Sequence, residues 1–115
     1  MGYGFPKQNK LCGPLRIAQF YREGKRFVAW PLRVTWAKTD EETQILIWAP
    51  KSLFKKAVQR NHLRRLMREA YRLNQSLLGD AHYQIAFNYM AKEEQSLAVI
   101  EKAVQKALKK IAHEQ

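Results

Sequence analysis

Residues 51–72 read KSLFKKAVQRNHLRRLMREAYR and hold eight of the chain's 21 lysines and arginines but only one acid, Glu69. Arginine recurs there at every fourth position, at Arg60, Arg64, Arg68 and Arg72. Residues four apart share one side of an α-helix, so the pattern predicts a helix with a row of positive charge, and Asn61 and Arg65 fill the same side. Like charges at this spacing repel by about 0.2–0.5 kcal/mol per pair, so an anionic partner is expected.

The reverse side of this stretch is apolar at helical spacing. The residues concerned are Leu63, Leu66, Met67, Ala70 and Leu73. This arrangement predicts an amphipathic helix over about 58–73 that docks on a core and holds its arginines outward.

The charge of the whole chain agrees with that of the helix. A net charge of +11 on 115 residues attracts polyanions, and nucleic acid is the leading candidate. Two alternatives are that the charge only keeps the protein soluble, or that it meets an acidic membrane. A membrane partner is not expected, because no wide face of exposed hydrophobes adjoins the basic stretch. A content of 46% hydrophobic residues is enough for one core.

The remaining patterns predict an extended N-terminal arm, three strands and two further helices. The arm covers 1–12, the helices 14–23 and 96–112, and the strands 27–36, 44–49 and 83–89. Strand 44–49 is apolar on both faces and is therefore expected to be central. The lysines on the outer face of the last helix are expected to be solvated. The order α-β-β-α-β-α predicts a single α+β domain over 13–115, with one sheet packed by helices.

Groups that could perform catalysis are scarce in this sequence. The three histidines, His62, His82 and His113, lack neighbours that suggest a triad, and the acids 40–42 fit a solvated turn. The single cysteine excludes an internal disulfide, and no Cys/His cluster has metal-ligand spacing. We therefore predict no catalytic residue and no metal site. No apolar run reaches membrane length, and a cytoplasmic protein is expected.

The groups that are present suit nucleic-acid recognition. Arginine pairs bidentately with phosphate, and exposed aromatic rings stack on the bases of single strands. Most rings must serve the core of so small a domain, and Phe20 and Tyr21 on the short first helix are the best candidates for ligand contact. Charge alone does not identify the polyanion. An RNA-binding subunit of a larger complex, a structural RNA-binding protein of the ribosomal type and a DNA-binding helix all stay open. Strands on both sides of the basic helix argue against the last.

Residues 56–72, KAVQRNHLRRLMREAYR, resemble the signature of the protein subunit of bacterial ribonuclease P, in which an Arg-Asn-Arg core precedes a basic amphipathic helix. Flanking segments agree, namely APKSLFK at 49–55 and FYREGK at 20–25, together with Phe5-Pro6-Lys7 and Leu11-Cys12. These features resemble the Bacteroidetes-like branch of that family, and the resemblance covers nearly the whole chain.

The resemblance implies a four-stranded sheet with a left-handed β-α-β crossover, an exception to the usual handedness. A fourth strand is then expected within residues 27–37. It also implies that an RNA subunit, with Mg²⁺ held mainly by that RNA, removes the 5′ leader from precursor tRNA. The protein would bind the RNA subunit and the single-stranded leader, and sulfate or phosphate would stabilise its fold.

Two groups of site residues follow from the charge pattern and the resemblance together. The expected RNA-binding residues are Lys51, Lys55, Lys56, Arg60, Asn61, His62, Arg64, Arg65, Arg68 and Arg72. The expected leader-cleft residues are Ile17, Phe20, Tyr21, Arg33 and Thr35. His62 stands where the motif usually has arginine, so a weaker, pH-sensitive RNA contact is expected there. Ile17 stands where relatives often have phenylalanine, which removes one stacking ring.

Overall fold

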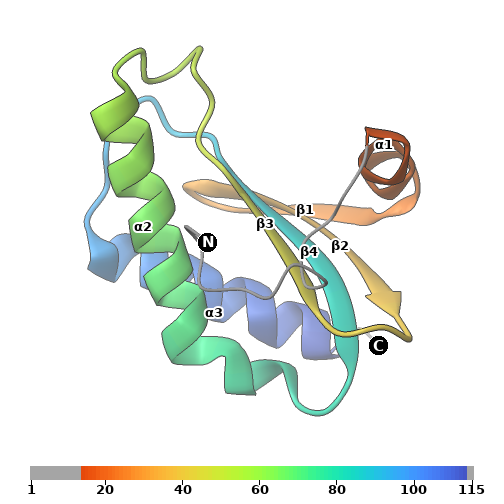
Figure 1. Cartoon of the computed structure of the whole chain (residues 1–115). Coiled ribbons are helices and arrows are strands. Elements are labelled where there is room, and N and C mark those ends of the chain that lie inside the picture. Colours follow the sequence, from red (N-terminus) through yellow and green to blue (C-terminus); the bar gives the residue numbers. More distant parts are fainter. Residues whose placement is uncertain (1–13, 114–115) are drawn as a thin grey trace.

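The computed structural model describes residues 14–113, with side chains from Ala18 onward (Figure 1). The expected arm at 1–12 therefore lies outside the described residues. The elements in chain order are α1 (Pro14–Glu23), β1 (Lys25–Ala29), β2 (Leu32–Thr39), β3 (Gln44–Trp48), α2 (Ala57–Asn74), the 3₁₀ turn η2 (Gln75–Leu78), β4 (His82–Tyr89) and α3 (Leu97–His113). The three predicted helices are confirmed, and the order matches the prediction once strand 27–36 is divided.

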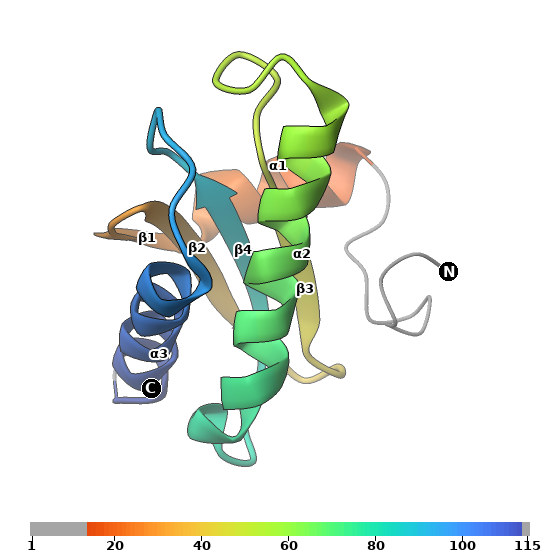
Figure 2. The same cartoon turned by 90° about the vertical axis from the view of Figure 1, so that its left-hand side faces the viewer.

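The four strands form one mixed sheet in the order β1-β2-β4-β3. β2 pairs antiparallel with β1 and β4, whereas β3 pairs parallel with β4. In Figure 2, β3 and β4 run parallel, β4 points upward, and β4 lies to the left of β3. The helix α2, which connects the two strands, lies in front of the sheet. A connection that passes in front of the sheet and leads to a strand on the left is a left-handed crossover. The four strands and the crossover expected from the resemblance are thus confirmed.

Two expectations about the strands are wrong. The single strand at 27–36 is a hairpin, because β1 ends at Ala29, β2 begins at Leu32 and the two pair antiparallel across the turn at Trp30–Pro31. The strand predicted to be central, β3, lies at the sheet edge. Its apolar pattern has another cause: Ile45 and Ile47 belong to the core on one face, while Leu46 packs with the first helix on the other.

The main core lies between the sheet and the helices α2 and α3, which cover the same face (Figure 1). Fully buried side chains there include Leu63, Met67, Tyr83, Ile85, Phe87, Ile100, Val104 and Leu108. The prediction that Leu73 of α2 belongs to the core is wrong, because its side chain is 49% exposed. Tyr71 and Asn74 are buried instead. The polar Asn74 is accommodated because it bonds to α3, as described below.

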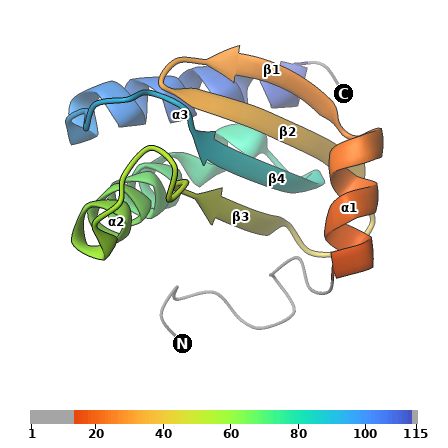
Figure 3. The same cartoon turned by 90° about the horizontal axis from the view of Figure 1, so that it is seen from above.

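Among residues 14–113, α1 is the one helix that covers the opposite face of the sheet (Figures 1 and 3). Phe20 packs there on Ala86, and Ala37 and Leu46 border the contact. Gly24 ends the helix: its N–H donates to the carbonyl of Phe20 at 2.8 Å. Because α1 has only ten residues, it covers part of this face, and no other described helix covers the rest.

Candidate nucleic-acid interface

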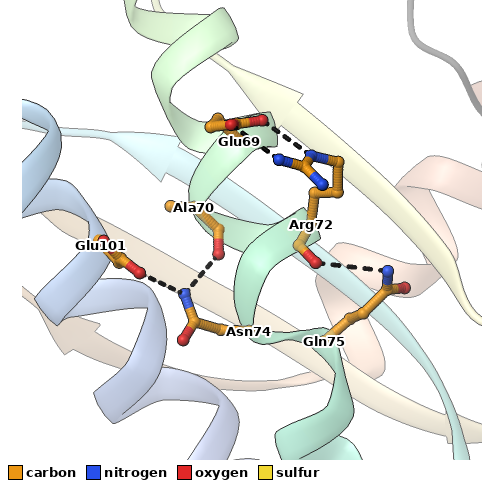
Figure 4. A network of polar contacts seen from close by, with 6 residues as sticks. All are labelled: Glu69, Ala70, Arg72, Asn74, Gln75 and Glu101. Carbon is orange, nitrogen blue, oxygen red and sulfur yellow. Dashed lines mark hydrogen bonds and ion pairs between the residues drawn. The ribbon is translucent and has the colours of Figure 1, made fainter.

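The basic face of α2 is turned away from α3. Asn74 marks the α3 side, because its amide donates to Glu101 at 3.1 Å and its Oδ1 accepts from Gln105 at 3.0 Å. Figure 4 shows Asn74 and Arg72 leaving α2 on different sides. The structure exposes Asn61, His62, Arg65 and Arg72, and half-buries Arg60, Arg64 and Arg68. The arginine row, Asn61 and Arg65 therefore form one outward side of α2, the basic flank, and His62 lies at its margin.

Some of these charges already have partners within the chain. Arg60 donates through Nη1 to the carbonyls of Phe54 and Lys55, at 2.8 and 2.9 Å, so it holds the segment that precedes the helix. Arg64 donates to the side-chain oxygen of Asn61. These bonds order the start of the basic face before any ligand arrives, which lowers the entropy lost on binding.

Glu69 pairs with Arg72 through two hydrogen bonds of 2.9 Å (Figure 4). The bonds lower the pKa of Glu69 and raise the pKa of Arg72. The charge of Arg72 is therefore already compensated within the chain by Glu69.

A second candidate surface is the open part of the sheet beside α1. Strand pairing aligns Val28, Arg33, Asn88 and Trp48 in one row across all four strands. They share a face because the alternate positions of β2 and β4 fill the core. The guanidinium group of Arg33, the amide of Asn88 and the indole of Trp48 therefore lie on neighbouring strands of the same face. Trp48 is 52% exposed, which leaves its ring available for stacking.

Arg33, Asn88 and Trp48 of this row line a cleft of about 380 Å³. The residues that line it are Tyr21, Arg26, Arg33, Thr35, Trp48, Pro50, Ser52, Leu53, Asn88, Tyr89 and Met90. The structure thus brings together Tyr21, Arg33 and Thr35, three of the expected cleft residues. It adds Arg26, Trp48 and Asn88, which the site prediction missed. The alternation of side chains along each strand indicates which residues share a face of the sheet. It does not show that Arg26, Asn88 and Trp48 lie close together, because that depends on how the strands pair.

Tyr21 closes one wall of the cleft. Its hydroxyl donates to Oδ1 of Asn88 at 3.2 Å, and burial raises its pKa, so the phenol stays neutral. Phe20 lies apart from this wall: it is 5% exposed and lines a separate pocket with Gln19 and Lys38. Its ring meets that of Tyr21 edge to face at 5.4 Å, so the structure places Phe20 as a support for Tyr21. The side chain of Ile17 lies outside the described residues.

The cleft and the basic face are joined by the segment 50–56. Ser52 and Leu53 line the cleft, and Lys51, Lys55 and Lys56 are exposed around them. Phe54 anchors the segment because it is buried against Tyr89, with ring centroids 5.6 Å apart. A single extended polyanion could therefore pass from the cleft to α2 without leaving the basic surface.

The described residues contain no group of three or more His, Cys, Asp or Glu side chains placed to hold a metal ion. The expected Mg²⁺ thus finds no ligand set of that kind in this part of the chain. Within the same residues, no helix is both long and apolar enough to span a bilayer.

Comparison with known proteins places the chain in a family. A family model described as "Ribonuclease P" matches residues 5–112. The ribonuclease P protein component of Porphyromonas gingivalis is 37% identical, covering 96% of this chain and 88% of that protein. The corresponding component of Methylococcus capsulatus is 28% identical, covering 91% and 82%. The Porphyromonas relative also confirms the resemblance to the Bacteroidetes branch.

Two solved structures share the fold. The RNase P protein of Staphylococcus aureus superimposes with a TM-score of 0.75 at 20% identity, covering 90% of this chain and 94% of that one. The RNase P protein of Thermotoga maritima gives 0.73 at 22% identity, covering 83% and 90%. From the family match and the Porphyromonas relative, the chain belongs to the ribonuclease P family of protein components.

Proposed function

We propose that this chain is the protein component of a ribonuclease P that removes the 5′ leader from precursor tRNA, and that it does so by holding RNA while an RNA subunit performs the cleavage. The observation that supports this best is the continuity of the cleft with the basic face of α2. In this proposal the basic flank binds the RNA subunit and the cleft holds the single-stranded leader. Mg²⁺ stays mainly with the RNA.

The cleft offers the two kinds of contact that a single strand needs. Trp48 and Tyr21 present rings on which bases can stack, worth about 1–3 kcal/mol per base. Arg26 and Arg33 can pair with phosphates through their planar guanidinium groups. Neither contact requires a particular base, so the site suits leaders of varied sequence.

The basic flank offers phosphate contacts on a rigid support. Arg65 is exposed, and Arg64 is oriented by its bond to Asn61. The bonds from Arg60 to the preceding segment keep Lys55 and Lys56 near the start of the helix. A folded RNA with closely spaced phosphates matches this surface better than an isolated anion does.

The first test is cleavage of precursor tRNA by the cognate RNA subunit at low Mg²⁺, with and without this chain. Stimulation of 5′ maturation is expected only when both subunits are present. If the chain gives no stimulation, or cleaves without the RNA subunit, the proposal is wrong.

A matched pair of variants tests the cleft. Arg33→Ala should weaken binding of a precursor with a long leader and leave a precursor with a single-nucleotide leader unaffected. Lys92→Ala removes the same charge from an exposed site outside both surfaces, and should change neither. Equal losses in the two variants would assign the effect to net charge alone.

The uncompensated charge also predicts a response to anions. A ligand that binds only the folded chain stabilises it by RT ln(1 + [L]/Kd). Sulfate or phosphate at concentrations above their dissociation constants should therefore raise the melting temperature. A melting temperature that is independent of sulfate would contradict this part of the proposal.

A further inference from the structure

A groove on the far side of the sheet from the cleft has no role in the proposed function. It lies between α3 and the turn that joins β1 to β2, and has a volume of about 580 Å³. The residues that line it are Ala29, Trp30, Val99, Lys102, Ala103, Gln105, Lys106 and Lys109. We call it the Trp30 groove.

Trp30 is an unusual residue to find at this turn. Its side chain is 57% exposed, although indoles normally contribute their large apolar area to a core or an interface. Trp36 shows the ordinary case, at 3% exposure in the main core. The exposed ring of Trp30 therefore forms a flat apolar platform at one wall of the groove.

The opposite wall is a row of lysines on α3. Lys102, Lys106 and Lys109 are four and three residues apart, so they share one side of the helix and span about 10 Å of its axis. No ion pair is recorded for these three lysines among residues 14–113, and no acid lines the groove. The nearest acid in sequence, Glu101, is bonded to Asn74 on α2. The lysines are therefore free to meet an external anion.

We propose that the Trp30 groove is a second binding site for single-stranded RNA, separate from the leader cleft. One base stacks on the indole of Trp30, and the neighbouring phosphates lie along the lysine row. The sheet separates this site from Trp48 and Arg33, so one RNA strand can occupy each face.

Single-stranded RNA fits this groove better than the other polyanions do. An acidic peptide would use the lysines, but the carboxylate side chains that pair with them have no ring to stack on the indole. A membrane would need a broad apolar surface, whereas Ala29 and Ala103 are buried and only one large ring is exposed here. The strand could come from the RNA subunit or from the precursor tRNA, since both contain the same chemistry.

The fluorescence of Trp30 provides a direct test in the full chain. Trp48→Phe leaves Trp30 as the exposed indole, with buried Trp36 as a constant background. Titration with a uridine oligonucleotide should quench Trp30. In this background Lys102→Gln/Lys106→Gln should raise the apparent Kd at least five-fold, while Lys38→Gln/Lys92→Gln should change it less than two-fold. If Trp48→Phe perturbs folding, the signal difference between wild type and Trp30→Phe supplies the same readout.

Two further comparisons distinguish the leader cleft from the Trp30 groove, and the RNA subunit from precursor tRNA as the source of the strand. Arg33→Ala should leave the quenching of Trp30 unchanged while it weakens leader binding, so failure of the cleft and failure of the groove are distinguishable. Quenching of Trp30 fluorescence by the RNA subunit alone would identify the RNA subunit as the source of the strand. Quenching that begins only after precursor tRNA is added would identify the precursor tRNA. Absence of quenching, equal losses in the two lysine pairs, or stronger quenching by polyglutamate or anionic vesicles would overturn the proposal.

Discussion

The hydroxyl of Tyr21 donates a hydrogen bond of 3.2 Å to Oδ1 of Asn88 and thereby joins α1 to β4 across the wall of the cleft. Asn88 lies in the row that ends at Trp48, so this bond fixes the distance between the two rings that we assign to leader binding. The bond and the ring of Tyr21 make separable contributions.

Tyr21→Phe keeps the ring and removes the bond, so leader affinity should fall only slightly and stability by about 0.5–1.5 kcal/mol. Tyr21→Ala also removes the stacking surface, and affinity should fall by about 1–3 kcal/mol, roughly 5- to 150-fold. The measurement is binding of precursor tRNA with a long leader to the assembled enzyme. Equal losses with a single-nucleotide leader would show that Tyr21 does not contact the leader.

Salt dependence should separate Arg65 from Arg72, although the sequence pattern assigns them the same role. If Arg65 contacts a phosphate, Arg65→Ala lowers the slope of log affinity against log salt by about one. Arg72→Ala should lower it less, because Glu69 already compensates this guanidinium. Binding of the RNA subunit over a range of salt concentrations gives both slopes. Two unaltered slopes would indicate a solvated face.

His62 should make a modest contact with the RNA subunit. Its ring is exposed on α2 and can donate or accept a hydrogen bond. His62→Ala should therefore lower the affinity for the RNA subunit by about 0.5–1.5 kcal/mol, the scale of one hydrogen bond. His82→Ala, at an exposed site outside both RNA surfaces, should leave the affinity unchanged. Equal affinities of His62→Ala and the wild type would refute the prediction.

The three helices could be predicted from sequence because each depends on a local period of 3.6 residues. The local pattern did not predict the hairpin, because Trp30–Pro31 lacks the Asn-Gly type of turn signal and the strand residues on either side run together. The fourth strand within residues 27–37 was expected from the family resemblance alone. The edge position of β3 depends on pairing with β4, which follows it by more than thirty residues, and no local pattern encodes that partner.

The candidate site divides in the same way. Alternation placed Arg33 and Thr35 on the correct face, because a strand's period needs no knowledge of its neighbours. The alignment of Asn88 with Trp48 required the register between β4 and β3. By contrast, the pairing of Glu69 with Arg72 was available from their spacing of three residues on a helix.

Gly24 should tolerate no side chain, because it lies where α1 meets the sheet. A Cβ at this position would come within 2.8 Å of the carbonyl oxygen of Phe20 and 3.0 Å of Cγ2 of Thr35. Overpacking of this kind costs about 1–3 kcal/mol, so Gly24→Ala should lower the melting temperature by several degrees. It should also weaken leader binding, because α1 positions Tyr21.

Gly79→Ala is the matched control for this variant. A Cβ there meets no atom within 4 Å, but the φ of +72° is strained for alanine and should cost about 1–2 kcal/mol. It should therefore lower stability without changing leader binding. A Gly24→Ala protein with the wild-type melting temperature, or with normal leader affinity, would show that α1 can shift without consequence.

Tyr71 should make the fold sensitive to alkaline pH. Burial against the core raises its pKa to about 12, from the usual 10. The folded chain thus favours the neutral phenol, so its contribution to stability is complete below about pH 10 and is lost as the pH rises from 10 to 12. Tyr71→Phe cannot ionise, and its free energy of unfolding should fall less steeply over that interval. Urea unfolding of both proteins between pH 8 and 12 measures the difference; parallel curves would mean that the phenol ionises equally well in the folded state.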